Sequence, residues 1–174
     1  MINPDDLDFS HFTPKDDFSN NDFTEDDGSD PLGVDEFIRK KARLYEDSNL
    51  SRVYTVRYDG KVVAFCAVSM SAIEVKKLAD GHAVEGATTK YYPAMLLGQM
   101  GVDKKYRNKR IGLSICKYCL GLAIEVGQKV GCAVLCLETN REKAGYYKKW
   151  GFVHAGREST GSKVWMYVRT AQAQ

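Results

Sequence analysis

Residues 102–113 read Val-Asp-Lys-Lys-Tyr-Arg-Asn-Lys-Arg-Ile-Gly-Leu, a basic turn between two apolar stretches. The apolar run 94–102 predicts a strand before the turn, and the periodic apolar residues of 113–126 predict a helix after it. The first backbone N–H groups of a helix have no partners within it, and together with the helix dipole they suit a bound anion. Because five Lys and Arg side chains crowd the same turn, we expect this strand–loop–helix unit to bind a pyrophosphate.

Further strands and helices can be placed on both sides of this unit from hydrophobic periodicity and turn residues. The expected elements are a helix over 34–45, strands over 52–58 and 62–69 joined at Asp59-Gly60, a strand over 92–102, a helix over 112–128, a strand over 132–138, a helix over 141–149, and a hairpin near 152–157 and 162–169. This order predicts an α+β fold around one mixed sheet. The long polar connection 76–90 is expected to cover the substrate cleft.

The basic loop resembles the acetyl-CoA loop of the GNAT N-acetyltransferases. The family pattern is Gln/Arg-x-x-Gly-x-Gly/Ala, and this chain reads Arg107-x-x-Arg110-x-Gly112, with Arg110 in place of the first glycine. Asn108 adopts a left-handed backbone more readily than most residues do, so the turn remains feasible. A solvated charged turn without a ligand is the alternative interpretation of this loop.

A second stretch, 139–152, is similar to the later motif of the same family. Asn140 and Tyr147 stand seven residues apart, as in the family, and Gly151-Phe152 follows, with glycine where a helix favours a left-handed end. A narrower resemblance to the TacT-type branch, whose members acetylate the free amine of aminoacyl-tRNA, covers roughly residues 33–168. The two motifs together identify the chain as a member of the GNAT superfamily.

The resemblance implies a GNAT fold, with a mixed, mostly antiparallel central sheet flanked by helices. In that fold the strands ending near Val102 and Glu138 splay into a V that holds acetyl-CoA, the co-substrate, and no metal takes part. The cofactor-binding residues that the resemblance implies are Met100, Gly101, Val102, Arg107, Asn108, Lys109, Arg110, Ile111, Gly112, Leu113 and Asn140.

Tyr147 is the candidate catalytic residue, because a phenol with a pKa of about 10 is protonated at neutral pH and can donate to a departing thiolate. The alternative for Tyr147 is a packing aromatic, and the alternative for Asn140 is a helix N-cap. No general base stands out in the sequence.

Three functions are compatible with these motifs. The first is direct transfer of acetyl from acetyl-CoA to a primary amine, with aminoacyl-tRNA as a TacT-like acceptor or, alternatively, a protein, peptide or small-molecule amine. The second is a module that binds CoA without turnover. The third is a partner-binding protein whose acidic segment mimics nucleic acid.

Charge divides the 174-residue chain unevenly. Residues 1–32 carry ten acidic side chains and one lysine, a net charge of −9, whereas the rest carries 24 basic and 13 acidic side chains, a net charge of +11. We therefore expect an acidic N-terminal extension over 1–32 packed on a GNAT domain over 33–170, whose basic character suits CoA phosphates and an RNA partner. The start of the chain has no signal-peptide pattern and no long apolar window, which predicts a cytoplasmic protein without a membrane partner. A homodimer is compatible with this interpretation.

The chain has five cysteines, and four of them form two closely spaced pairs, Cys116 with Cys119 and Cys132 with Cys136. Two such pairs suggest a zinc site. Residues four apart in a strand stand about 13 Å apart, whereas zinc holds sulfur at about 2.3 Å. Buried thiols in a reducing compartment are the expected state.

Overall fold

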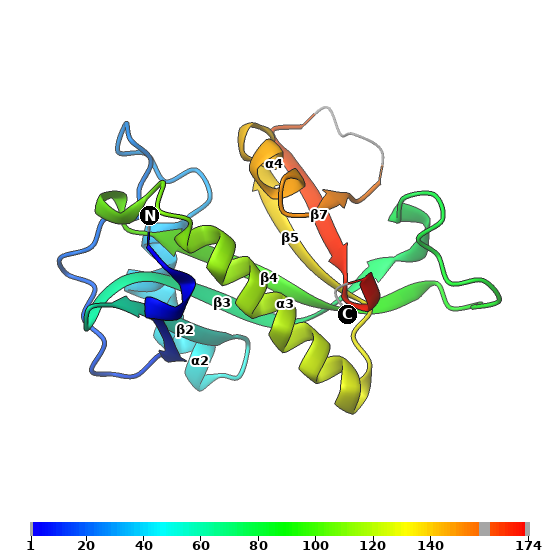
Figure 1. Cartoon of the computed structure of the whole chain (residues 1–174), viewed down its shortest axis with the longest axis horizontal. Coiled ribbons are helices and arrows are strands. Elements are labelled where there is room, and N and C mark those ends of the chain that lie inside the picture. The colour runs from blue at the N-terminus through cyan, green and yellow to red at the C-terminus, as the bar shows by residue number, and fades with distance from the viewer. Residues whose placement is uncertain (1, 157–160, 173–174) are drawn as a thin grey trace. The chain divides into compact units, whose positions relative to one another are not determined.

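The computed structural model describes residues 2–156 and 161–172, which fall into two compact units. The first unit comprises Met1–Ser69 and Gly98–Tyr118, and the second comprises Met70–Leu97 and Cys119–Gln174. The first unit contains β1 (Leu7–His11), α1 (Val34–Glu36), a π-helical turn (Phe37–Lys41), α2 (Ala42–Asp47) and β2 (Arg52–Tyr58). The second unit contains β5 (Val134–Asn140), α4 (Arg141–Lys148), β6 (Val153–His154) and β7 (Lys163–Arg169). Three elements run through both units, namely β3 (Lys61–Glu74), β4 (Tyr91–Val102) and α3 (Ile111–Val130) (Figure 1).

The described strands are hydrogen-bonded in the order β1-β2-β3-β4-β5-β7-β6. The β1–β2, β2–β3, β5–β7 and β6–β7 pairs are antiparallel and the β4–β5 pair is parallel, which confirms the predicted mixed, mostly antiparallel sheet. The β4–β5 ladder runs from Ala94 opposite Val134 to Leu97 opposite Leu137, and both strands continue beyond it. The splay between the two strand ends stays a prediction.

Most expected elements are present, with bounds shifted by a few residues. The predicted helix over 34–45 is continuous to Asp47 but contains the π-helical turn, and the predicted strand over 132–138 runs instead from Val134 to Asn140. Asp59 and Gly60 both have positive φ, as a tight hairpin turn requires. Of the C-terminal hairpin, residue 157 lies outside the described residues.

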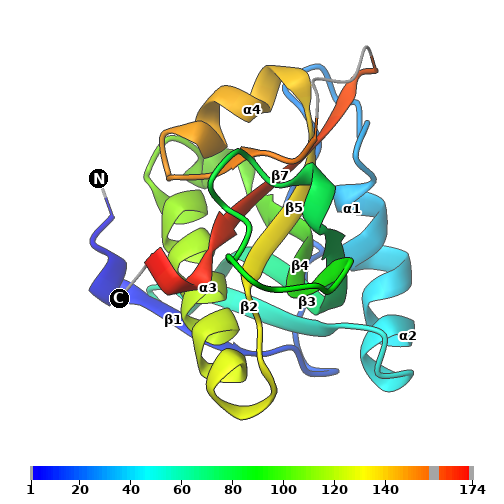
Figure 2. The same cartoon turned by 90° about the vertical axis from the view of Figure 1, so that its right-hand side faces the viewer.

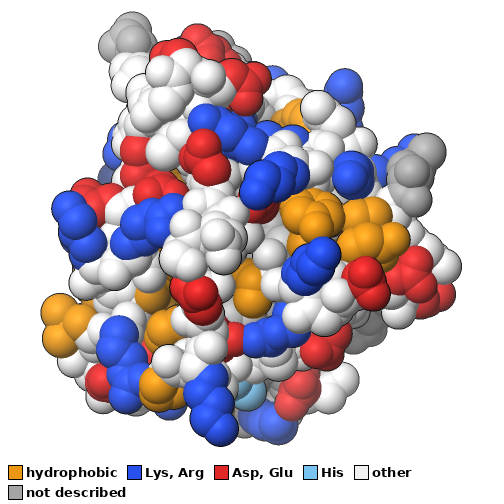
Figure 3. Space-filling view, turned by 90° about the vertical axis from the view of Figure 1, so that its left-hand side faces the viewer, with side chains coloured by type: hydrophobic (Ala, Val, Ile, Leu, Met, Phe, Trp, Pro, Cys, Tyr) orange, Lys and Arg blue, Asp and Glu red, His pale blue; other side chains and the backbone are white. Residues whose placement is uncertain are grey.

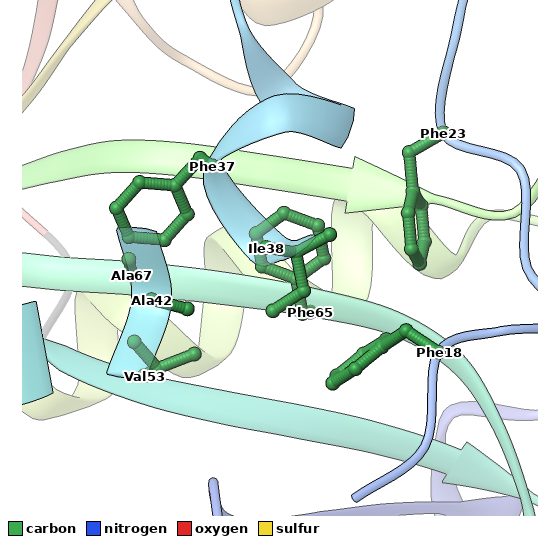
Figure 4. Packing of buried hydrophobic residues seen from close by; sticks show 8 residues of the cluster. All are labelled: Phe18, Phe23, Phe37, Ile38, Ala42, Val53, Phe65 and Ala67. Atoms are coloured by element: carbon green, nitrogen blue, oxygen red, sulfur yellow. The ribbon is translucent and has the colours of Figure 1, made fainter. Parts of the chain in front are cut away.

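The acidic segment contributes a strand and part of a hydrophobic core to the first unit. Its strand β1 pairs with β2 from Leu7 opposite Tyr58 to His11 opposite Tyr54. Phe18 and Phe23 are buried against Phe65, with ring centroids 6.2 and 5.0 Å away (Figure 4). Aromatic burial of this kind stabilises a fold by about 1.5–3 kcal/mol per side chain, so the segment is integral to the unit. The assignment of 1–32 as an extension distinct from a domain over 33–170 stays a prediction, and its first residue lies outside the described part.

The lack of a side chain at Gly101 allows Phe23 of the acidic segment to pack close to β4. A Cβ atom at this position would lie 2.6 Å from the Phe65 ring and 2.9 Å from both the Phe23 ring and the Val34 side chain. Ordinary carbon contacts are about 3.5–4.0 Å, so any side chain at 101 would displace this packing.

The core of the second unit lies beneath the connection between β3 and β4. Tyr167 is fully buried, and its hydroxyl accepts a hydrogen bond from the Ala79 backbone N–H at 2.7 Å and lies 2.8 Å from Nδ1 of His82. The connection therefore passes over β5 and β7 (Figure 2). Cys136 is buried in the same core, and this burial raises the pKa of its thiol to about 11.

Helix α3 is long and apolar enough, by length and composition alone, to cross a membrane. Its buried residues, however, are Ile111, Ser114, Ile115, Cys116, Cys119 and Ala123, and four of these recur every four residues along one face. A buried stripe of this period is typical of a helix that packs one face against the core of a globular domain.

Candidate functional site

The basic loop begins with a fully buried carboxylate. Asp103 follows β4, and its Oδ1 accepts the Lys105 backbone N–H at 2.9 Å, which caps the short 3₁₀ turn Lys104–Tyr106. Its Oδ2 accepts a hydrogen bond of 2.8 Å from Nδ2 of Asn21, which also donates to the Val62 carbonyl oxygen at 2.9 Å. A buried charge is stable only when it is hydrogen-bonded, and these contacts provide that for Asp103.

Two residues of the loop have a left-handed backbone. The φ angle is 62° at Asn108 and 68° at Arg110. Arg110 occupies the position where the family pattern has glycine, and the positive φ explains that preference, because glycine alone adopts it without steric cost. The turn therefore forms with arginine at this position, at the expense of local strain.

The turn brings the chain directly into the first turn of α3. The first hydrogen bond of the helical type joins the Ser114 N–H to the Arg110 carbonyl oxygen at 3.2 Å. The N–H groups of Ile111, Gly112 and Leu113 precede it, and such N–H groups together with the helix dipole attract an anion. The structure thus places these three predicted residues consecutively at a helix N-terminus.

Three cations of the loop contact the acidic segment, and Lys105 does so by donating from Nζ to the Asn20 carbonyl oxygen at 3.4 Å. The guanidinium of Arg107 donates to the carbonyl oxygens of Thr24 at 2.6 Å and Phe23 at 3.3 Å, and it pairs with Asp26 at 3.2 Å. The ammonium of Lys104 pairs with Asp22 at 2.9 Å.

The same contacts account for the charge state of Asp22. The Thr24 hydroxyl, followed by the Lys104 ammonium, holds the pKa of Asp22 far below its usual range. The face shown in Figure 3 accordingly presents acidic and basic side chains side by side. Within this loop, Lys109 lies 5.0 Å from the centre of the Tyr106 ring, and Arg110 is exposed.

The predicted pantetheine-binding residues lie at the end of β4. Met100 and Val102 are half-buried, whereas Gly101 is buried. The Val102 carbonyl oxygen accepts a hydrogen bond from Nε of Arg107 at 3.3 Å, which fixes the first bend of the loop against the strand. The first unit therefore gathers Met100 to Leu113 into one strand–loop–helix segment, as predicted.

Asn140 in the second unit is the N-cap of α4. Its φ and ψ of −76° and 157° are extended, and its Oδ1 accepts the Lys143 backbone N–H at 3.2 Å. The structure therefore confirms that Asn140 is a helix N-cap. Donation from its amide NH₂ group to a ligand is compatible with this cap, because the cap uses only the oxygen.

Tyr147 lies on the last turn of α4 and is half-buried. Its ring makes edge contacts with Trp150 at 5.6 Å and Phe152 at 5.8 Å, and its carbonyl oxygen accepts the backbone N–H groups of both residues at 2.9 and 3.1 Å. Gly151 has a φ of 87°, which allows the chain to reverse after the helix. Two aromatic neighbours therefore pack against the Tyr147 ring, and the turn at Gly151 brings one of them, Phe152, beside it.

Sequence reasoning missed the residues that support the loop. Asn21, Thr24 and Asp103 have no catalytic motif, and the first two lie more than 75 residues from the loop they contact. Only Asp103 carried a local signal, because Asp is a preferred cap residue directly before a turn.

Comparison with known proteins gives this arrangement a family. Residues 49–154 match the family described as acetyltransferase (GNAT) domain. The chain is 24% identical over 120 residues to a tRNA-acetylating toxin of Mycobacterium tuberculosis, covering 68% of this chain and 71% of the relative. It is 24% identical over 131 residues to a probable toxin TacT of Sinorhizobium fredii, covering 70% of this chain and 72% of the relative.

Solved structures share the fold. AtaT complexed with acetyl-methionyl-tRNAfMet matches with a TM-score of 0.82 and 17% identity over 97% of both chains. AtaTR bound with AcCoA matches with a TM-score of 0.76 and 17% identity, covering 97% of this chain and 96% of that chain. These structures confirm the predicted fold. The family match confirms the acyltransferase class with acetyl-CoA as co-substrate, and the chain belongs to the GNAT acetyltransferase family.

Proposed function

We propose that this protein transfers the acetyl group of acetyl-CoA to the free α-amino group of an aminoacyl-tRNA. Membership of the GNAT family provides the acyl transfer. The acceptor rests on the two toxin relatives, which match along about 70% of this chain, and of which one acetylates tRNA by its name. The proposal also locates the protein in the cytoplasm, where aminoacyl-tRNA is used.

The observation that carries the donor half of the proposal is the left-handed turn at Asn108 and Arg110. It places the N–H groups of Ile111, Gly112 and Leu113 at the start of α3, where they would hold the diphosphate of acetyl-CoA. Arg107 was predicted to bind the same group. Its guanidinium and its N–H are both engaged within the protein, so its role would be to hold the loop in shape.

The reaction forms an amide and breaks a thioester. The acceptor nitrogen attacks the acetyl carbonyl carbon, the C–S bond breaks, the nitrogen loses a proton, and the sulfur of CoA gains one. Backbone N–H groups near Met100 to Val102 would stabilise the oxygen that becomes negative during attack. Tyr147 would donate the proton to the sulfur as the general acid. An aminoacyl amine has a low pKa, so the chemistry requires no strong general base.

The direct test is mass spectrometry of bulk aminoacyl-tRNA after incubation with the enzyme and acetyl-CoA. The expected product is N-acetyl-aminoacyl-tRNA, formed by the native protein and strongly reduced with Tyr147→Phe. Polyamines, a lysine peptide and a peptide with a free N-terminus serve as competing acceptors. Acetylation of one of these amines with none on aminoacyl-tRNA would overturn the acceptor but keep the acyl transfer. Binding of acetyl-CoA without any product would indicate a CoA-binding module.

A further inference from the structure

An exposed tryptophan lies on β7 in the second unit. The side chain of Trp165 is 43% exposed, although its neighbours Val164 and Met166 are buried. A single exposed apolar residue is ordinary in a protein surface, so exposure alone assigns no role. The position of Trp165 within the β5–β7 ladder and the charges around it are more informative.

One face of the β5–β7 ladder is covered at one end and open at the other. Cys136 stands opposite Tyr167, and both are buried beneath the connection that is anchored on the Tyr167 hydroxyl. Two residues along each strand on the same face, Glu138 stands opposite Trp165, and both side chains are exposed. The next pair on this face is Asn140 opposite Lys163. The open end of the face therefore runs from Trp165 to the cap residue that was predicted to bind CoA.

Charged residues of both signs lie near Trp165, because Glu138 stands directly opposite it on β5 and Lys163 follows two positions away on the same face of β7. Nζ of Lys163 pairs with Glu138 at 3.2 Å, and the Lys163 side chain is 52% exposed. The Ala155 N–H donates to the Trp165 carbonyl oxygen at 2.9 Å, and the next residue, Gly156, donates to the Lys77 carbonyl oxygen at 2.6 Å. These backbone bonds place Lys77 near the same edge. An exposed aromatic ring with lysines near it is an arrangement with which proteins bind single-stranded nucleic acid, because bases stack on the ring and phosphates pair with the cations.

We propose that Trp165 is a stacking platform for an unpaired base at the 3′ end of the acceptor RNA, with Lys163 and Lys77 near its phosphates. This inference rests on the proposed function, since it assigns the acceptor end of tRNA to the open face of β5 and β7. Stacking tolerates any base, so Trp165 would contribute affinity for the single-stranded end without selecting the tRNA species.

The test uses two RNA hairpins with the same acceptor stem, one ending in an unpaired 3′-CCA and the other blunt. Trp165→Ala should weaken binding of the CCA hairpin by roughly 5- to 100-fold and leave the blunt hairpin unchanged. Trp165→Phe should retain part of the difference, since it keeps an aromatic face. Tyr91→Ala is the matched control, because Tyr91 is 45% exposed on β4 of the same unit. The Tyr91→Ala variant should bind the CCA hairpin and the blunt hairpin as tightly as the native protein does.

Four results would overturn the platform. The first is unchanged binding of the CCA hairpin by Trp165→Ala, and the second is equal weakening of both hairpins. Equal affinity of the native protein for the two hairpins would also overturn the platform. The proposed function is judged separately by product formation on aminoacyl-tRNA, so a protein that binds the CCA end through Trp165 but forms no product keeps the platform and loses the function. Conversely, a KM for aminoacyl-tRNA that Trp165→Ala leaves unchanged keeps the function and removes the platform.

Discussion

The guanidinium of Arg107 donates to the carbonyl oxygen of Thr24 at 2.6 Å, although the two residues are 83 positions apart in the chain. This contact connects the basic loop to the acidic segment and gives Arg107 a structural role. A phosphate-binding arginine would be expected to present its guanidinium to the ligand, whereas this one donates to backbone oxygens of its own chain.

Replacement of Arg107 should therefore reduce stability. Arg107→Ala removes hydrogen bonds from a charged group to the oxygens of Phe23, Thr24 and Val102, and we expect the free energy of unfolding to fall by about 2 kcal/mol in urea titrations. Asp26→Asn is the control, because the Asp26 side chain is 96% exposed and such a pair contributes less than about 1 kcal/mol. Equal effects of the two substitutions would contradict this assignment.

Arg110→Gly should stabilise the protein. The residue has a φ of 68°, and a left-handed backbone costs a residue with a Cβ about 1–2 kcal/mol. Because glycine also adds conformational freedom to the unfolded chain, we expect a net gain of about 0.5–1 kcal/mol in chemical denaturation. Arg110→Ala keeps the Cβ and should give no such gain. A destabilised Arg110→Gly variant would mean that the arginine side chain holds the loop.

Gly112→Asp should weaken binding of acetyl-CoA by at least about tenfold. The substitution puts a negative charge on the first turn of α3, where the diphosphate is expected, and like charges repel. Isothermal calorimetry measures the affinity. Gly121→Asp, on the same helix with no atom within 4 Å of its added Cβ, is the control and should bind normally. Native affinity in a folded Gly112→Asp variant would move the cofactor site away from this helix start.

Tyr147→Phe should fold and bind acetyl-CoA but lose turnover. The phenylalanine ring keeps the edge contacts with Trp150 and Phe152, so only the hydroxyl is removed. Loss of a general acid typically lowers kcat by about 10²–10⁴-fold. The measurement is kcat on aminoacyl-tRNA with saturating acetyl-CoA, and a native value would exclude Tyr147 from proton transfer.

Asp22 should contribute to stability in a pH-dependent way. Hydrogen bonds from Thr24 and pairing with Lys104 lower the pKa of Asp22 in the folded protein below its unfolded value of about 3.9. The contribution is therefore present above about pH 4 and is lost as the pH falls below it.

Native protein should exceed Asp22→Asn in stability by up to about 1 kcal/mol at pH 6, since the Asp22 side chain is half exposed. The difference should shrink between pH 4 and pH 2, as followed by urea unfolding at each pH. A difference that grows on acidification would contradict the lowered pKa.

The sequence by itself determined the features that depend only on residues close together in the chain. The hairpin at Asp59-Gly60, the N-cap at Asn140 and the turn before α3 depend on neighbours within a few residues, so residue type and spacing were sufficient to predict them. The same holds for the two family motifs, whose residue types and spacing predict the GNAT family that the family match confirms.

Long-range packing decided the rest. The acidic segment has the composition of a disordered tail, and no local pattern indicates that Phe23 packs on Phe65 beside Gly101 or that Arg107 reaches Thr24. Those contacts form because burial of aromatic rings and pairing of opposite charges offset the entropy of ordering the segment, and both gains exist only once β4 and the loop are folded. Trp165 is exposed because the connection between β3 and β4 covers Tyr167 but ends before it reaches Trp165. The sequence of β7 alone does not predict this difference.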